Sequence, residues 1–142
     1  MNILTFEDHQ APAEGDASIL VVDNTVDPRA LALDGVTRID LNFPKFTDGR
    51  AYSQAYLLRR RLGFAGEIRA TGDVLIDQLV QMARSGFSTA VLREGLSAGA
   101  AQRQFARFKA FYQGDAAHPA PHFADADKAA ANAAEVERPV AA

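Results

Sequence analysis

Two short stretches of the sequence share one pattern, Arg61-Leu-Gly63-Phe64 and Arg84-Ser-Gly86-Phe87. In each stretch the arginine closes an amphipathic segment, the glycine suits the left-handed turn that ends a helix, and the phenylalanine can pack back against it. A strand-like segment follows each copy. The repeat therefore predicts two successive helix-to-strand units, which are typical of a parallel sheet with right-handed crossovers.

Further strands and helices extend this repeat in both directions. Strands are expected at 18–22, 36–41, 67–70 and 89–92, and helices at 51–62, 74–84 and 97–112. We therefore expect a single α/β domain of repeated β/α units around a parallel sheet of about four strands. Four strands are too few for a closed eight-stranded barrel, which needs ~250 residues, so the sheet should be open or half-barrel-like.

The two ends of the chain carry few large apolar residues. Residues 1–16 include several acidic side chains, and residues 115–142 are rich in alanine and proline. Segments of this composition bury too little apolar surface to offset the entropy lost on ordering. The sequence therefore predicts a flexible acidic segment at 1–16, a folded domain at 17–114 and a disordered tail at 115–142.

The composition excludes several kinds of chemistry. With 142 residues, of which 48% are hydrophobic, the chain is long enough for one domain with its own core. It contains no cysteine, which excludes disulfides, thiolate-held iron–sulfur clusters and a cysteine nucleophile. No apolar run approaches the ~18 residues of a membrane span, and acidic residues stand where a signal peptide would be basic and then apolar. We expect a cytoplasmic protein that contacts no membrane.

The formal net charge of −3 conceals an uneven distribution. Cations outnumber acidic residues between positions 36 and 112, and most of them are arginines, which suit carboxylate or phosphate partners. Arginine-rich codon usage is the simpler explanation of this excess. A nucleic-acid partner is not expected, because the basic residues are not interleaved with exposed aromatics and the pI is about 5.5.

Three loops are expected to meet at the carboxyl edge of the sheet, where parallel α/β folds bind their ligands. They span residues 42–50, 69–73 and 93–97, and each sets a cation beside a glycine and a helix N-terminus, which favours an anion. The candidate residues for binding an anion or a partner are Lys45, Thr47, Asp48, Gly49, Arg50, Arg69, Gly72, Asp73 and Arg93. Ordinary helix capping explains the polar residues of these loops equally well, although it does not explain the neighbouring cations.

No catalytic motif is found. The three histidines, His9, His118 and His122, lie in the expected flexible ends, which argues against a catalytic triad in the core. Pro119 and Pro121 prevent the helix that would align the last two histidines on a metal ion, so no metal site is expected. Neither a G-x-G-x-x-G run after a strand nor a P-loop occurs, and the catalytic residues, if any, stay unassigned.

Two longer runs, Phe46-Thr-Asp-Gly-Arg50 and Arg69-Ala-Thr-Gly-Asp-Val74, carry a resemblance to a known family. Together with the elements between 36 and 112, they resemble a bacterial family of domains of unknown function described as oxidoreductases of sulfite reduction. Its members are typically encoded beside the sirohaem sulfite reductase haemoprotein and phosphoadenylyl-sulfate reductase. Many relatives carry cysteine where this chain has Ser85, so the resemblance implies no thiol role here. No catalytic residues are established for the family, so the resemblance assigns none to this chain.

The resemblance implies three alternative functions. The chain would be an accessory protein of assimilatory sulfite reduction that docks on the haemoprotein or its electron donor, which suits a small domain without redox centres. The second alternative is an oxidoreductase that holds a flavin or nicotinamide by its phosphate at the three loops. The third alternative is a binding module for a phosphorylated or sulfated metabolite, which would use the same loops without catalysis. The first is preferred. No covalently bound cofactor is expected, and the oligomeric state stays open.

Overall fold

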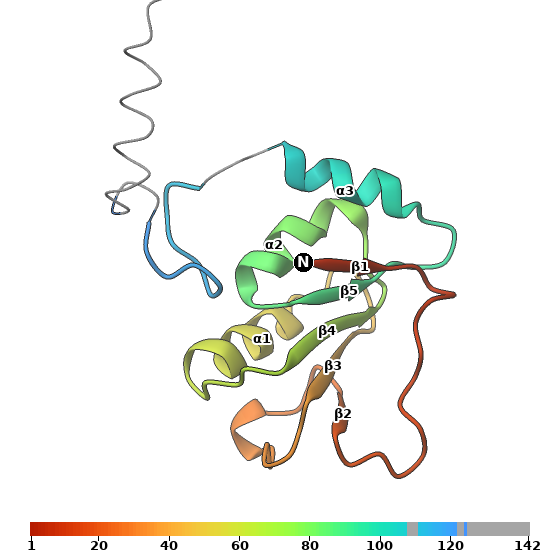
Figure 1. The fold of residues 1–142 in the computed structure, drawn as a ribbon, viewed down its shortest axis with the longest axis vertical. Helices are drawn as coiled ribbons and strands as arrows, with labels where there is room; N and C mark the ends of the chain where they lie inside the picture. Colours follow the sequence, from red (N-terminus) through yellow and green to blue (C-terminus); the bar gives the residue numbers. More distant parts are fainter. Residues whose placement is uncertain (108–110, 122–123, 125–142) are drawn as a thin grey trace, which may run out of the picture.

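The structure, a computed structural model, describes residues 1–107, 111–121 and 124. Its centre is a five-stranded sheet in the order β1-β5-β4-β3-β2, in which all neighbouring strands run parallel (Figure 1). The strands are β1 (Asn2–Leu4), β2 (Ile19–Val22), β3 (Arg38–Phe43), β4 (Glu67–Gly72) and β5 (Thr89–Val91). The expected α/β fold with a parallel sheet is confirmed, and the sheet is open, which is one of the two forms expected, with one strand more than the sequence predicted.

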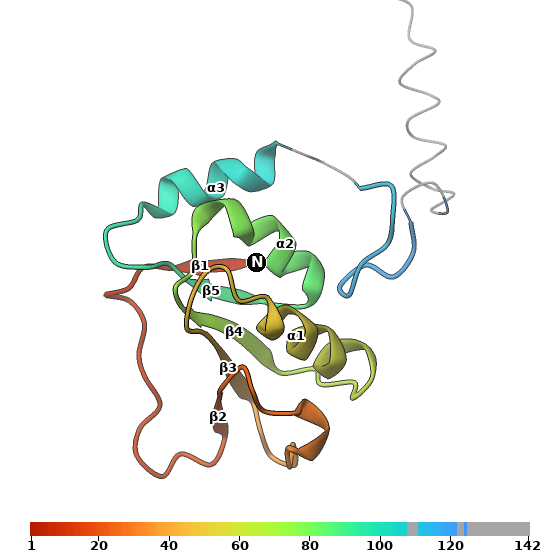
Figure 2. The ribbon, with the colours of Figure 1, turned by 180° about the vertical axis from the view of Figure 1, so that it is seen from behind.

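Helices cover one face of this sheet, as the two opposite views show (Figures 1 and 2). They are α1 (Arg50–Arg60), α2 (Leu79–Ser85) and α3 (Ala98–Ala106), with short 3-10 turns η1 (Pro28–Ala30) and η2 (Ile76–Gln78). Alternate residues of β3, namely Ile39, Leu41 and Phe43, are fully buried beneath the helices. The period-2 pattern of the strands and the 3.6-residue pattern of the helices therefore meet in one core.

Helix α1 differs from its expected bounds by one residue at its start and two at its end, and α2 and α3 differ by more. The helix expected at 74–84 begins only after η2, because Gly72 turns with φ at 90° and Leu75 is extended, with φ at −103° and ψ at 153°. The helix expected at 97–112 ends at Ala106, and residues 108–110 lie outside the described part of the chain. Tyr112, the last residue of the expected helix, is 78% exposed.

The fifth strand is β1, which comes from the segment expected to be flexible at 1–16. Asn2 donates its amide hydrogen to the Ser88 carbonyl over 2.8 Å, and Leu92 donates to the Leu4 carbonyl over 2.9 Å. Three residues are enough to add an edge strand, although they are too few to give an apolar pattern in the sequence. The remainder of 1–16 connects the two opposite edges of the sheet, on the side away from α1 and α2 (Figures 1 and 2).

Charged pairs occupy the sheet face that lies away from the helices. Arg38 pairs with Asp40 at 2.8 Å, and the Asp40 side chain is only 2% exposed. Arg69 pairs with Glu67 at 2.8 Å and donates to the Nδ1 atom of His9 at 3.2 Å. His9 was expected in a flexible end of the chain, but Arg69 contacts it and Arg38 donates to the neighbouring Gln10 carbonyl at 3.3 Å, so this part of the segment lies against the sheet.

The described part of the expected tail contacts α2. The Ala116 amide donates to the Arg84 carbonyl over 2.9 Å, and the Arg84 side chain pairs with Asp115 at 3.4 Å. Ala116 is buried as a result. Residues 122–123 and 125–142, including His122, lie outside the described residues, and the domain boundaries at 16/17 and 114/115 stay predictions.

Candidate functional site

Asp73 joins the three loops that follow β3, β4 and β5. Its Oδ2 atom accepts the Phe46 amide hydrogen at 3.0 Å, and its Oδ1 atom accepts from Arg93 at 3.1 Å. Asp73 directly follows Gly72, whose positive φ brings the end of β4 against the Phe43 carbonyl. One carboxylate therefore fixes the relative positions of loops 44–49, 72–75 and 92–97 at the carboxyl edge of the sheet.

Asp48 makes a second cluster on the first of these loops. It pairs with Arg50 at 2.7 Å, accepts the Arg50 amide hydrogen at 3.2 Å and accepts from the Asn24 side chain at 2.7 Å. Arg50 is the main reason why the pKa of Asp48 falls to about 2. The pair ties the start of α1 to the loop after β2 and keeps the carboxylate ionised at any physiological pH.

Most of the predicted site residues share this edge. The residues on these joined loops, or at the strand end and helix start next to them, are Lys45, Thr47, Asp48, Gly49, Arg50, Gly72, Asp73 and Arg93. Arg69 is the exception. The strand expected to end at residue 70 continues to Gly72, so Arg69 lies inside β4, where its side chain pairs with Glu67 and is 11% exposed.

Helix capping accounts for only part of the loop chemistry. Gly49 is the N-cap of α1 and Ser97 is the N-cap of α3, and neither helix has a side-chain hydrogen bond at its cap residue. Asp48 does accept an amide hydrogen from the first turn of α1, as a capping group would. Asp73, by contrast, bonds across loops rather than to the helix that follows it.

Two arginines at this edge, Arg50 and Arg93, are each matched by a carboxylate. The side chains of Arg50 and Arg93 are 58% and 54% exposed, and they pair with Asp48 and Asp73. A small anion would have to compete with these internal carboxylates for the guanidinium groups. A partner that approaches from outside can contact the exposed sides of both pairs without breaking them.

Phe46 is the residue at this edge that the sequence analysis missed. Its side chain is 46% exposed, yet its backbone is held on both sides, because Asp73 accepts its amide hydrogen and the Gln78 side chain donates to its carbonyl at 2.8 Å. The available signal was an aromatic residue between Lys45 and Thr47 in an otherwise polar loop. The loop therefore presents an aromatic side chain, on a backbone that is held on both sides, to solvent between charged side chains.

Within the described residues, no cluster of three or more histidine, cysteine, aspartate or glutamate side chains could hold a metal ion. A helix long and apolar enough to cross a membrane is likewise not found in that part of the chain.

Comparisons with known proteins place the sequence in one family. The family model described as a bacterial protein of unknown function, DUF934, matches residues 19–123, which include β2 to β5 and all three α-helices. Neither the curated proteins nor the solved structures that were compared gave a match.

Proposed function

The chain belongs to the DUF934 family of bacterial proteins of unknown function, and we propose that it is a cytoplasmic accessory protein of assimilatory sulfite reduction. It docks on the sirohaem sulfite reductase haemoprotein through Lys45, Phe46, Arg50 and Arg93, which we call the docking edge. The resemblance to proteins encoded beside that haemoprotein supports the choice of partner. The geometry of the docking edge supports binding to a protein.

The exposed ring of Phe46 carries the proposal. Aromatic residues and arginines dominate the energetics of protein interfaces, and an aromatic residue whose backbone is already ordered loses less entropy on binding than one on an unordered loop. Hydrogen bonds to Asp73 and from Gln78 hold the backbone of Phe46 on both sides. A partner that buries this ring gains apolar contact at a small ordering cost.

The two flanking arginines indicate the chemistry of the partner surface. Arg50 and Arg93 are each more than half exposed, with their Asp48 and Asp73 partners on the protein side. Guanidinium groups of this kind suit carboxylates at the rim of an interface, where they set orientation and association rate more than affinity. We therefore expect an apolar pocket bordered by acidic residues on the haemoprotein.

Calorimetric titration of the purified haemoprotein with the full chain tests this proposal. Phe46→Ala should weaken binding by ~10-fold or more, because truncating a central aromatic residue costs ~2 kcal/mol or more. Tyr56→Ala is the matched control, since Tyr56 on α1 is also 46% exposed but lies outside the docking edge. Equal affinities for the two variants, or no binding by the unaltered chain, would overturn the proposal.

The two other expected functions give different results in simple measurements. A flavin or nicotinamide enzyme would show the absorbance of its cofactor in the purified protein or after incubation with it. A module for a phosphorylated or sulfated metabolite would bind that small anion at the docking edge in competition with the Asp48 and Asp73 carboxylates. Either result without haemoprotein binding would replace the docking function.

A further inference from the structure

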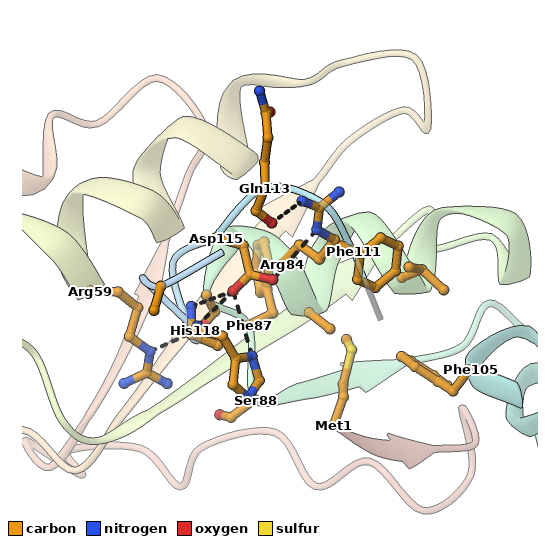
Figure 3. Close-up of a pocket in the computed structure, with 15 residues that line it drawn as sticks. Met1, Arg59, Arg84, Phe87, Ser88, Phe105, Phe111, Gln113, Asp115 and His118 are labelled. Atoms are coloured by element: carbon orange, nitrogen blue, oxygen red, sulfur yellow. Dashed lines mark hydrogen bonds and ion pairs between the residues drawn. The ribbon is translucent and has the colours of Figure 1, made fainter. Parts of the chain in front are cut away.

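A separate cleft of about 690 Å³ lies at the opposite, amino edge of the sheet (Figure 3). It lies between the start of β1, the ends of α1 and α2, the helix α3 and the described segment 111–120. Its volume falls within the range of small-molecule sites, ~300–1,000 Å³. None of the docking-edge residues lines it, so the cleft is independent of the proposed function.

One side of the cleft is apolar. Val80 and Ala83 on α2, Phe105 on α3 and Met1 supply aliphatic and aromatic surface, and Phe111 extends it. Figure 3 shows the Met1 and Phe105 side chains on the same side of the cleft, below Phe111. This wall suits an aromatic or aliphatic body rather than a free inorganic ion.

The other side of the cleft is cationic. Arg59 donates to the carbonyl oxygens of Gly86, Phe64 and Gly66 at 2.8, 2.7 and 2.6 Å, and no described carboxylate forms an ion pair with it. Burial lowers the pKa of the Arg59 guanidinium, which nevertheless stays charged at neutral pH. Its charge is therefore left without an opposite charge at the wall of the cleft.

A second arginine at the cleft is neutralised. Arg84 pairs with Asp115 at 3.4 Å and lies 4.3 Å from the centre of the Phe111 ring. His118 is 3.6 Å from the same carboxylate, and Figure 3 shows these groups together at the polar side. Asp115 therefore compensates the charge of Arg84, whereas no carboxylate described at the cleft compensates the charge of Arg59. The cleft carries an excess of positive charge.

We propose that this cleft binds a small organic anion whose aromatic or aliphatic body lies on the Phe105 side and whose acidic group faces Arg59. Charge complementarity selects the anion, and the apolar wall selects the body. A neutral molecule of the same shape gains only the second contribution, and an inorganic anion gains only the first.

Two fluorescent probes test both parts of the proposal in the full chain. The first probe is 8-anilinonaphthalene-1-sulfonate, an aromatic sulfonate, and the second is N-phenyl-1-naphthylamine, its uncharged counterpart. The sulfonate should bind with a one-to-one stoichiometry and ~10-fold more tightly than the amine, because only the sulfonate compensates the charge of Arg59. Equal affinity for both probes would overturn the assignment to an anion.

A variant that fills the cleft locates the binding site. Ala83→Leu enlarges a partly exposed residue of the apolar wall and should weaken sulfonate binding by ~10-fold or more. Ala106→Leu makes the same change on the exposed side of α3, outside the cleft, and should leave binding unchanged. Unchanged near-ultraviolet circular dichroism shows that each variant is folded. Equal binding by both folded variants, or no saturable binding by the unaltered chain, would overturn the proposal.

Discussion

The two edges of the sheet use arginine in opposite ways. At the carboxyl edge, Arg50 and Arg93 are more than half exposed, and each pairs with an aspartate on its own side of the molecule. At the amino edge, Arg59 is half-buried and donates to three backbone carbonyls instead of a carboxylate. The number of arginines in a loop or helix end therefore does not say whether they bind a partner or stabilise the fold.

The difference follows from the backbone groups that need hydrogen-bond partners at each edge. The turns that follow α1 and α2 lie at the amino edge, and their carbonyls at Phe64, Gly66 and Gly86 accept from one guanidinium, which provides several donors in one plane. The carboxyl edge instead receives helix starts and turning loops, whose amide hydrogens are accepted by aspartates. At the amino edge an arginine therefore stabilises the turns while its charge stays without a carboxylate, whereas at the carboxyl edge carboxylates hold the arginines in place and leave them exposed to a partner.

Removing Arg59 should have the largest effect on stability. Arg59→Ala leaves the carbonyls of Gly86, Phe64 and Gly66 without their donor, which we expect to lower the free energy of unfolding by ~3–4 kcal/mol. Urea denaturation of the full chain measures this loss.

Arg60→Ala is the control for that experiment, since Arg60 is the next residue of α1 and is exposed. Its free energy of unfolding should change by less than ~0.5 kcal/mol. Similar losses in the two variants would show that the carbonyl contacts of Arg59 are not what stabilises the amino edge.

A smaller loss is expected from a glycine at the carboxyl edge. Gly72 has φ at 90°, and a Cβ atom there would meet the Phe43 carbonyl oxygen and would lie 2.6 Å from the Asn42 Oδ1 atom. Gly72→Ala should therefore lower the free energy of unfolding by ~2–3 kcal/mol, measured by urea denaturation.

Gly95→Ala separates strain from crowding, because Gly95 has φ at 82° but nothing within 4 Å of a Cβ atom. It should cost only ~1 kcal/mol, the conformational penalty alone. If the two variants lose the same stability, the close approach of β3 and β4 does not require glycine, and the carboxyl edge is less constrained than the contacts at Gly72 imply.

Much of the fold could be predicted from local patterns. The repeated Arg-x-Gly-Phe stretches and the alternating apolar residues identify the start of β4, and identify β5 and α1 to within two residues at each end, because propensity, turn residues and burial agree there. Strand β1 could not be found in this way. Its three residues are held by hydrogen bonds to residues 88 and 92, which only the folded chain brings near.

The sequence could predict where the candidate site lies, but it could not predict which contacts its side chains make. Parallel topology alone brings the loops after β3, β4 and β5 to one edge, so Asp48, Asp73 and Arg93 were found from their positions after strands. Arg69 was misplaced because β4 continues two residues beyond its expected end. The role of Arg59 depends on carbonyls of two turns, one of them 27 residues away, and residues 59–61 look alike in the sequence as exposed arginines of one helix.

The smallest effect on stability and a clear effect on binding are expected from Arg50→Ala. Its pair with Asp48 is largely exposed, so its loss should lower the melting temperature by less than ~3 °C at neutral pH. Because Arg50 depresses the folded-state pKa of Asp48 to about 2, below the ~3.9 of an unfolded aspartate, its contribution is present above pH ~4. The contribution is lost as the pH falls from about 4 to about 2, so the melting temperatures of the unaltered chain and the variant should converge over that range.

The same variant separates stability from docking. Arg50→Ala should weaken binding to the haemoprotein most clearly at low ionic strength, because an arginine at the interface rim acts through long-range charge that salt screens. Arg29→Ala is the control, since Arg29 also pairs with an aspartate two residues earlier, Asp27, in a more exposed position away from the docking edge. A large fall in melting temperature with unchanged binding would make Arg50 a structural residue like Arg59, and the contrast between the two edges would then disappear.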